Sequence, residues 1–211
     1  MKSKPLNIVI YLPKNIEEIS IKSSKEIYKK GGLFYLNKKT NFPHITLYMS
    51  QFPIKNIPKI KEVLKKIASK IKTFELEAIN YRYNTNTNYV DVEFKKTIQI
   101  NKLQNLIIKS INPLREGLLR KEDEIRILNP DLNQKIKEII NKKGTSSMGK
   151  KYFPHITLSR INKSKSKFSL NENINKLPNI QNFNHKLFKI GLFFQGKHGT
   201  CSKKIDLFDL N

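Results

Sequence analysis

Two histidines and two threonines stand in identical surroundings in this sequence. The hexapeptide Phe-Pro-His-Ile-Thr-Leu occupies residues 42–47 and occurs again, letter for letter, at residues 153–158. Proline followed by β-branched residues favours an extended chain, and the side chains of alternate residues on a strand share a face. Each copy therefore presents one imidazole and one hydroxyl on the same face, His44 with Thr46 and His155 with Thr157.

This set of side chains suits the cleavage of a phosphodiester. The reaction needs one group that removes a proton from the attacking oxygen and another that delivers a proton to the leaving oxygen. Histidine can take either role near neutral pH, because its ordinary pKa is about 6.5. Threonine hydroxyls can donate hydrogen bonds to the phosphoryl oxygens. If both motifs face one cleft, the reaction needs neither a metal ion nor another cofactor.

The repeat also has structural explanations. A lone His-x-Thr sequence on a strand is most simply a surface histidine or a satisfied core histidine. An old duplication would produce two copies, although it does not explain why the polar pair stayed identical along with the apolar residues. Two of the four histidines in the chain lie in the repeat, and packing alone does not require this. The second copy therefore favours a shared function.

The duplicated motif resembles that of the 2H phosphoesterase superfamily. The residues that carry the resemblance are His44-Ile45-Thr46-Leu47 and His155-Ile156-Thr157-Leu158. Their flanks, and Arg160 after the second copy, are similar to the 2′-5′ RNA ligase-like and RNA 2′,3′-cyclic phosphodiesterase branch. The resemblance implies one α+β domain over residues 1–211. Its fold would be bilobal, with two pseudo-symmetric antiparallel-sheet lobes and packing helices around a central cleft, and each lobe would present one motif.

The resemblance also implies an enzyme, a metal-independent phosphodiesterase that acts on 2′,3′-cyclic phosphate ends of RNA or nucleotides. The expected catalytic residues are His44, Thr46, His155 and Thr157, and the expected substrate-binding residues are Arg160, Tyr11 and Tyr48. Three alternatives stay open: a 2′-5′ phosphodiesterase or RNA ligase-type activity on oligoadenylates or RNA, hydrolysis of a small nucleotide, and RNA binding without catalysis. Which histidine is the base also stays open. We expect a monomer.

The charge of the chain has two explanations of equal weight. Lysine and arginine total 41 residues against 17 acidic residues, for a formal net charge of +24. A strongly positive surface attracts RNA and other polyanions, and such binding weakens with salt. However, lysine, asparagine and isoleucine are abundant throughout, as an AT-biased coding sequence would produce. Arginine occurs at only five positions, namely Arg82, Arg115, Arg120, Arg126 and Arg160.

Other features bound the compartment and the class of site. The single cysteine, Cys201, excludes an internal disulfide and fits a reducing, cytoplasmic location. The apolar run over residues 6–12 contains Asn7 and stops at Pro13, so it predicts a first strand better than a signal sequence. No stretch approaches the length of a membrane span. His198 and Cys201 have a spacing found at zinc sites, but no second pair accompanies them, so we expect no metal site.

Periodicity predicts the elements that position the two motifs. Helices are expected over residues 15–30, 56–72, 101–112, 131–141 and 171–177. Strands are expected over 6–12 and 33–36, and hairpins are expected to join 74–83 to 89–94 and 188–195 to 204–210. In the helix over 101–112, the side chains expected to face inward are Leu103, Leu106, Ile107 and Ile111.

The stretch from Glu116 to Lys151 is longer than in compact members of the superfamily, which makes the substrate harder to assign than the chemistry. Its last part, residues 142–151, is a basic loop directly before the second motif. That loop either borders the cleft, where it would touch an RNA backbone, or is a solvated surface loop. After the second motif, residues 162–167 are expected to form a basic polar linker.

Overall fold

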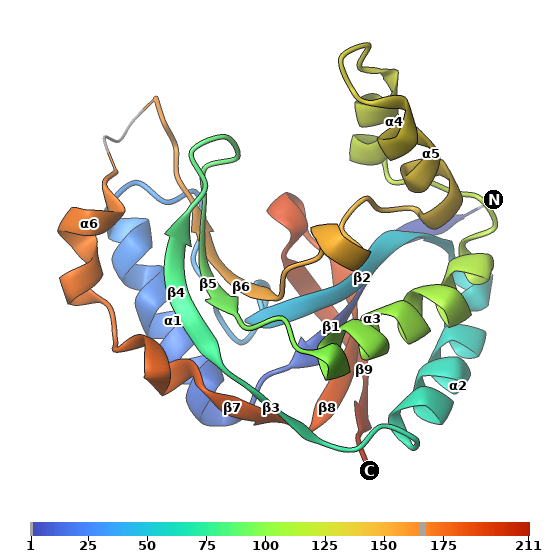
Figure 1. The fold of residues 1–211 in the computed structure, drawn as a ribbon, viewed down its shortest axis with the longest axis horizontal. Coiled ribbons are helices and arrows are strands. Elements are labelled where there is room, and N and C mark those ends of the chain that lie inside the picture. Colours follow the sequence, from blue (N-terminus) through green and yellow to red (C-terminus); the bar gives the residue numbers. More distant parts are fainter. Residues whose placement is uncertain (1, 165–167) are drawn as a thin grey trace.

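An antiparallel sheet of seven strands organises the structure. The strands are β1 (Ser3–Tyr11), β2 (His44–Pro53), β4 (Ala78–Tyr83), β5 (Tyr89–Phe94), β6 (His155–Arg160), β8 (Lys189–Gln195) and β9 (Cys201–Asp209). In the computed structural model, which describes residues 2–164 and 168–211, they lie in the order β4-β5-β6-β2-β1-β8-β9 (Figure 1). Two short strands, β3 (Phe74–Leu76) and β7 (His185–Leu187), pair separately. The expected α+β class is confirmed.

The longer helices pack against this sheet. The helices are α1 (Lys14–Lys29), α2 (Ile57–Ala68), α3 (Ile98–Ile111), α4 (Lys121–Leu128), α5 (Gln134–Lys143) and α6 (Leu170–Asn173). Helix α1 packs against β6, α3 packs against β2, and α2 packs against β8 and β9, whereas α4 and α5 contact each other. Within residues 2–164 and 168–211, none of the helices combines the length and the apolar character that crossing a bilayer requires.

The two copies of the motif meet at the centre of the sheet. Strands β2 and β6 are antiparallel and pair at Ile45 and Ile156, the same position of the two hexapeptides. The units β1-α1-β2 and β5-α3-β6 are equivalent, since in each a strand is followed by a helix and by the motif strand that pairs with it. Their helices are exchanged, because α1 packs under the second motif and α3 under the first. The halves of the sequence are therefore interleaved in space.

Both motif strands carry a β-bulge at the same place. Beside β2 the register shifts between Ile8 and Val9, and beside β6 it shifts between Val90 and Asp91. A bulge places an extra residue on one strand and interrupts the strict alternation of faces. Here it turns two consecutive residues toward the core on each motif strand: Leu47 with Tyr48, and Leu158 with Ser159.

The prediction of a strand over residues 33–36 was wrong. Leu33 N donates to Arg160 O (2.7 Å), and Leu36 N donates to Ser24 Oγ (2.8 Å). Phe34 O accepts a hydrogen bond from the Ser159 hydroxyl (2.6 Å). The backbone groups of this segment are therefore satisfied by a neighbouring carbonyl and by hydroxyl side chains, rather than by a ladder.

Three further expectations need correction or fall outside the described residues. The strand expected over 74–83 is divided into β3 and β4, and β3 pairs with β7 instead of continuing the hairpin. Leu106 was expected to face inward from α3, but it is 37% exposed, and the side chain of Gln104 is buried instead. Of the linker expected over 162–167, residues 165–167 lie outside the part of the chain that the structure describes. The remaining helices and the final hairpin are confirmed, with ends shifted by a few residues.

Candidate active site

A cavity of about 650 Å³ brings the two motifs together. The side chains of His44, Thr46, His155 and Thr157 all line it. The alternate residues of both hexapeptides, Ile45, Leu47, Ile156 and Leu158, are buried, although Leu47 also borders the cavity. The predicted division of each motif into a buried apolar pair and a polar pair at the cavity thus holds except at Leu47.

The His44 ring is held in the neutral form. Its Nδ1 lies 2.7 Å from the carbonyl oxygen of Phe42, which can only accept, so Nδ1 carries the proton. Its Nε2 lies 3.2 Å from the side-chain amide nitrogen of Asn7, which can donate to it. The pKa of His44 is lowered from 6.5 to about 4, mainly by burial and also by the charge of His155, against the opposing hydrogen bond to Phe42. Near neutral pH, Nε2 therefore has a lone pair.

The His155 ring has different neighbours. Its Nδ1 lies 3.0 Å from the carbonyl oxygen of Phe153. The imidazole also stacks on the phenyl ring of Phe153, with the ring centroids 4.7 Å apart. The guanidinium of Arg82 lies 4.3 Å from the centre of the Phe153 ring. Both Phe153 and Arg82 line the cavity. The second histidine is thus positioned by a backbone carbonyl, as the first is, and additionally by an aromatic ring.

Acidic residues lie beside the second motif only. On the strand next to the first motif, Val9 pairs with Thr46 and Tyr11 pairs with His44. At the equivalent positions beside the second motif, Asp91 pairs with Thr157 and Glu93 pairs with His155. Glu93 forms an ion pair with Arg82, whereas Asp91 is buried and lines the cavity. Burial raises the pKa of Asp91, while attraction to His155 and a hydrogen bond from Thr157 oppose the rise.

The two threonines also differ. The Thr157 hydroxyl donates to Asp91 Oδ1 (2.9 Å). The Thr46 hydroxyl accepts instead, from the side-chain amide of Asn7 (3.3 Å). Because a hydroxyl has one proton, Thr46 can still donate to a ligand in the cavity, whereas Thr157 can do so only when it releases Asp91.

Of the three expected substrate-binding residues, Arg160 lies in the cavity. Its Nε donates to Thr87 O (3.1 Å), and its guanidinium lies 5.4 Å from the centre of the Tyr89 ring. One N–H group therefore fixes the side chain, and the remaining N–H groups of the fork are available to an anion.

The expectation that Tyr48 and Tyr11 bind substrate stays a prediction, and of the two only Tyr48 lines the cavity. Tyr48 is only 1% exposed, and its hydroxyl lies 2.8 Å from Lys143 O and 3.1 Å from Asn112 Oδ1. The β-bulge explains this, because it turns Tyr48 into the core where alternation would place it beside His44 and Thr46. Tyr11 is not among the lining residues, and its ring stacks on Phe193 with centroids 6.3 Å apart.

Several residues that line the cavity, and Asn7, which contacts His44 and Thr46, were missed by the sequence analysis. Asn7 and Asp91 had a visible signal, since each interrupts a run of apolar strand residues. His198 had none: it lies at φ 59° in the turn before β9, and its ring stacks on Phe34 with centroids 5.7 Å apart. Thr145 and Ser147 also line the cavity, so the loop before the second motif borders the cleft. Within the described ranges, no group of three or more His, Cys, Asp or Glu side chains could hold a metal ion.

Comparisons with known proteins identify the fold. No family model matches the sequence, and no curated protein matches it. Among solved structures, E. coli LigT in its apo form is similar with a TM-score of 0.60 and 14% identity, over 100% of this chain and 99% of that chain. TT0787 of Thermus thermophilus is similar with a TM-score of 0.62 and 14% identity, over 98% and 97%. The chain therefore has the fold of LigT, as its resemblance to the 2H phosphoesterases predicted.

Proposed function

We propose that this protein is a metal-independent phosphodiesterase that opens the 2′,3′-cyclic phosphate ends of RNA or nucleotides. The observation that carries the proposal is that two imidazoles, one of them with a lowered pKa, share one cavity with two hydroxyls. E. coli LigT has also been crystallised in complex with 3′-AMP, at a TM-score of 0.60 and 13% identity over 100% of this chain and 99% of that chain. The phosphate of 3′-AMP occupies one of the two ribose positions that a cyclic phosphate bridges.

The different neighbours of the two histidines assign their roles. His44 is the general base, because its Nε2 has a lone pair near neutral pH. His155 is the general acid, because it is the other imidazole of the cavity and the reaction needs a second proton-transfer group opposite the base. A water oxygen bonds to phosphorus as its proton passes to His44. The bond from phosphorus to one ribose oxygen breaks, and that oxygen takes the proton of His155, which leaves a phosphate monoester.

Thr46 and Arg160 hold the phosphate during this exchange, while Thr157 orients Asp91. Thr46 donates to a phosphoryl oxygen, since it acts only as an acceptor toward Asn7. Thr157 binds Asp91 and keeps it beside His155. Arg160 supplies positive charge near the second motif. Negative charge that develops on phosphorus-bound oxygens is thereby stabilised without a metal ion.

The test is ring opening in the presence of EDTA. Wild-type protein is incubated with a dinucleotide that ends in a 2′,3′-cyclic phosphate, and the products are separated by chromatography. We expect His44→Ala and His155→Ala each to lower turnover by about 10²–10⁴-fold, as the loss of a general acid or base does. The control is Thr85→Ala, since Thr85 is exposed in the β4–β5 turn and does not line the cavity.

The products also discriminate between the alternatives. The position of the phosphate, on the 2′ or the 3′ oxygen, identifies the leaving oxygen that His155 protonates. Full activity of both histidine variants would contradict the proposal. If the wild type binds the dinucleotide tightly and does not open it, the cavity is a binding site for RNA and not a catalytic one.

A further inference from the structure

The arginines of this chain are concentrated at the cavity. Four of the five, Arg82, Arg120, Arg126 and Arg160, line it, and none of the lysines in the described ranges does. A compositional bias that fills the chain with lysine does not produce this separation. Arginine differs from lysine in its planar fork of N–H donors, which binds a phosphate through two parallel hydrogen bonds. The pattern therefore indicates phosphate recognition at the cavity.

The four arginines come from two separate parts of the fold. Arg82 and Arg160 belong to β4 and β6, whereas Arg120 and Arg126 lie at the start and within α4. In Figure 1, α4 and α5 rise on one side of the motif strands, and the β4–β5 hairpin rises on the other. The cavity has lining residues from both sides, so positive charge reaches it from two directions.

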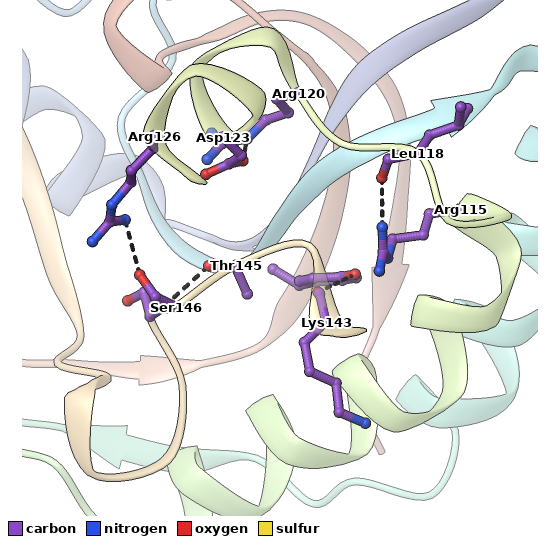
Figure 2. Close-up of polar contacts among 10 residues, drawn as sticks. Arg115, Leu118, Arg120, Asp123, Arg126, Lys143, Thr145 and Ser146 are labelled. Carbon is purple, nitrogen blue, oxygen red and sulfur yellow. Dashed lines mark hydrogen bonds and ion pairs between the residues drawn. The ribbon is translucent and has the colours of Figure 1, made fainter. Parts of the chain in front are cut away.

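Two of the four arginines have no acidic partner within the described residues. Arg82 forms an ion pair with Glu93. Arg120 forms an ion pair with Asp123 (2.6 Å), in which the side chain of Arg120 is 13% exposed and that of Asp123 is 4% exposed. For Arg126, Nη1 donates to Ser146 Oγ (2.9 Å), as Figure 2 shows, and this leaves the other N–H groups of its exposed guanidinium to a ligand. Arg126 on α4 and Arg160 on β6 are thus the two arginines best able to bind phosphate.

The base of α4 and α5 is fixed by buried polar contacts. The fifth arginine, Arg115, is 3% exposed and donates to Leu118 O (2.6 Å), to Asn112 Oδ1 (2.8 Å) and to Asn141 O. Figure 2 shows it between the segment that precedes α4 and the end of α5. These contacts tie the segment that precedes α4 to the end of α5, so both ends of the α4–α5 excursion are joined below Arg126.

We propose that Arg126 on α4 binds a second phosphate of the substrate, the phosphodiester that precedes the cyclic end, so that the substrate class is an RNA strand. This inference rests on the proposed function, in which Arg160 and the two motifs hold the reacting phosphate. A nucleoside 2′,3′-cyclic phosphate has no second phosphate and would leave Arg126 unused. Helix α4 also directs Glu122 into the cavity, and its charge opposes the binding of any phosphate there.

The test measures binding without turnover. Dissociation constants of the 3′-phosphorylated mononucleotide and the 3′-phosphorylated trinucleotide are determined by calorimetry at several salt concentrations. The wild type is expected to prefer the trinucleotide, and Arg126→Ala is expected to reduce that preference about tenfold, because charge-assisted hydrogen bonds are lost. The slope of log K against log salt for the trinucleotide should shrink by about 0.7, the value for one phosphate contact on a single strand.

Two neighbours of Arg126 on the same helix sharpen the result. Lys121→Ala removes the same charge from an exposed position that does not line the cavity, so both the preference and the slope should stay unchanged. Glu122→Gln removes the opposing charge and should tighten trinucleotide binding several-fold. A general electrostatic effect would change binding in Lys121→Ala as well as in Arg126→Ala, whereas a direct contact between Arg126 and the phosphate would change it in Arg126→Ala alone.

Three outcomes would overturn the inference. The first is that the wild type binds the mononucleotide and the trinucleotide with equal affinity. The second is that Arg126→Ala has the same binding as Lys121→Ala, and the third is that a nucleoside 3′,5′-bisphosphate binds as tightly as the trinucleotide. The last result would assign Arg126 to a mononucleotide with a 5′-phosphate. Since binding is measured with products, a failure of the inference is distinct from a failure of ring opening.

Discussion

At the scale of single residues, the two halves of the site carry the same histidine and threonine but different strand neighbours. Val9 and Tyr11 are the strand neighbours of the first motif, while Asp91 and Glu93 place carboxylates beside the second motif. Burial disfavours the charged form of an imidazole, and this lowers the pKa of His44. The repeat thus supplies two copies of one group, and the neighbouring strands give them different surroundings.

This difference predicts an asymmetric pH profile for ring opening. The base must be neutral, and burial lowers the pKa of His44 from 6.5 to about 4, so activity should rise as pH increases through about 4 and not through 6.5. The measurement is kcat/KM between about pH 4 and 9, the range in which these groups titrate. A rising limb centred near pH 6.5 would contradict the assignment of His44 as base.

Asp91→Asn should slow ring opening. The amide keeps the shape of the side chain and can still accept from Thr157, but it removes the charge that interacts with His155. We expect kcat/KM to fall about tenfold, which corresponds to a loss of about 1.4 kcal/mol of transition-state stabilisation. Val9→Ala, at the equivalent position beside the first motif, is the control for packing. An unchanged kcat/KM in Asp91→Asn would show that Asp91 has no electrostatic role.

The sequence predicted the four motif residues correctly as lining one cleft, but not the groups that distinguish them. Asn7 and Asp91 were recognisable as polar residues within apolar strands. Their importance depends on which strand pairs with which motif, and this is decided by contacts between residues far apart in the chain. His198 reaches the cavity through a turn with positive φ, which no periodic pattern signals.

At the scale of elements, the paired β-bulges decide which side chains reach the cavity. Alternation along a strand correctly places His44 with Thr46, but it fails at Tyr48, one residue beyond the bulge. The segment over 33–36 fails for a related reason, because hydroxyl side chains satisfy its backbone groups. Periodicity therefore predicts regular elements well, while irregular positions depend on partners that a single sequence does not reveal.

The junction between α5 and the loop before the second motif tolerates only glycine. Gly144 has φ +67°, and a Cβ there would lie 2.3 Å from Ser50 Oγ and 3.1 Å from Arg115 Cδ. Gly149 has φ +54°, with no atom within 4 Å of such a Cβ. Gly144→Ala should therefore destabilise the protein by more than Gly149→Ala, with a difference of about 1–3 kcal/mol from the clash. Equal losses in chemical denaturation would show that Ser50 and Arg115 move aside without cost.

At the scale of the whole molecule, the interleaved halves explain why the two motifs share one cavity. Helix α1 follows β1 in sequence but packs under β6, and α3 precedes β6 but packs under β2. Each motif strand is thus supported by a helix from the other half, although the strands themselves pair only at Ile45 and Ile156. The exchanged helices, rather than an extensive ladder, hold the two imidazoles in register.

The distribution of charge over the molecule predicts two kinds of RNA binding. Lysines outside the cavity account for most of the net charge of +24, and they attract any polyanion, whereas the cavity arginines act on the strand end. Affinity for an RNA of about 30 nucleotides should therefore fall with salt several times more steeply than affinity for a trinucleotide, since each phosphate contact adds about 0.7 to the log–log slope. Heparin should abolish the advantage of the long RNA. Equal slopes for the two lengths would mean that the lysine surface contributes nothing to RNA binding.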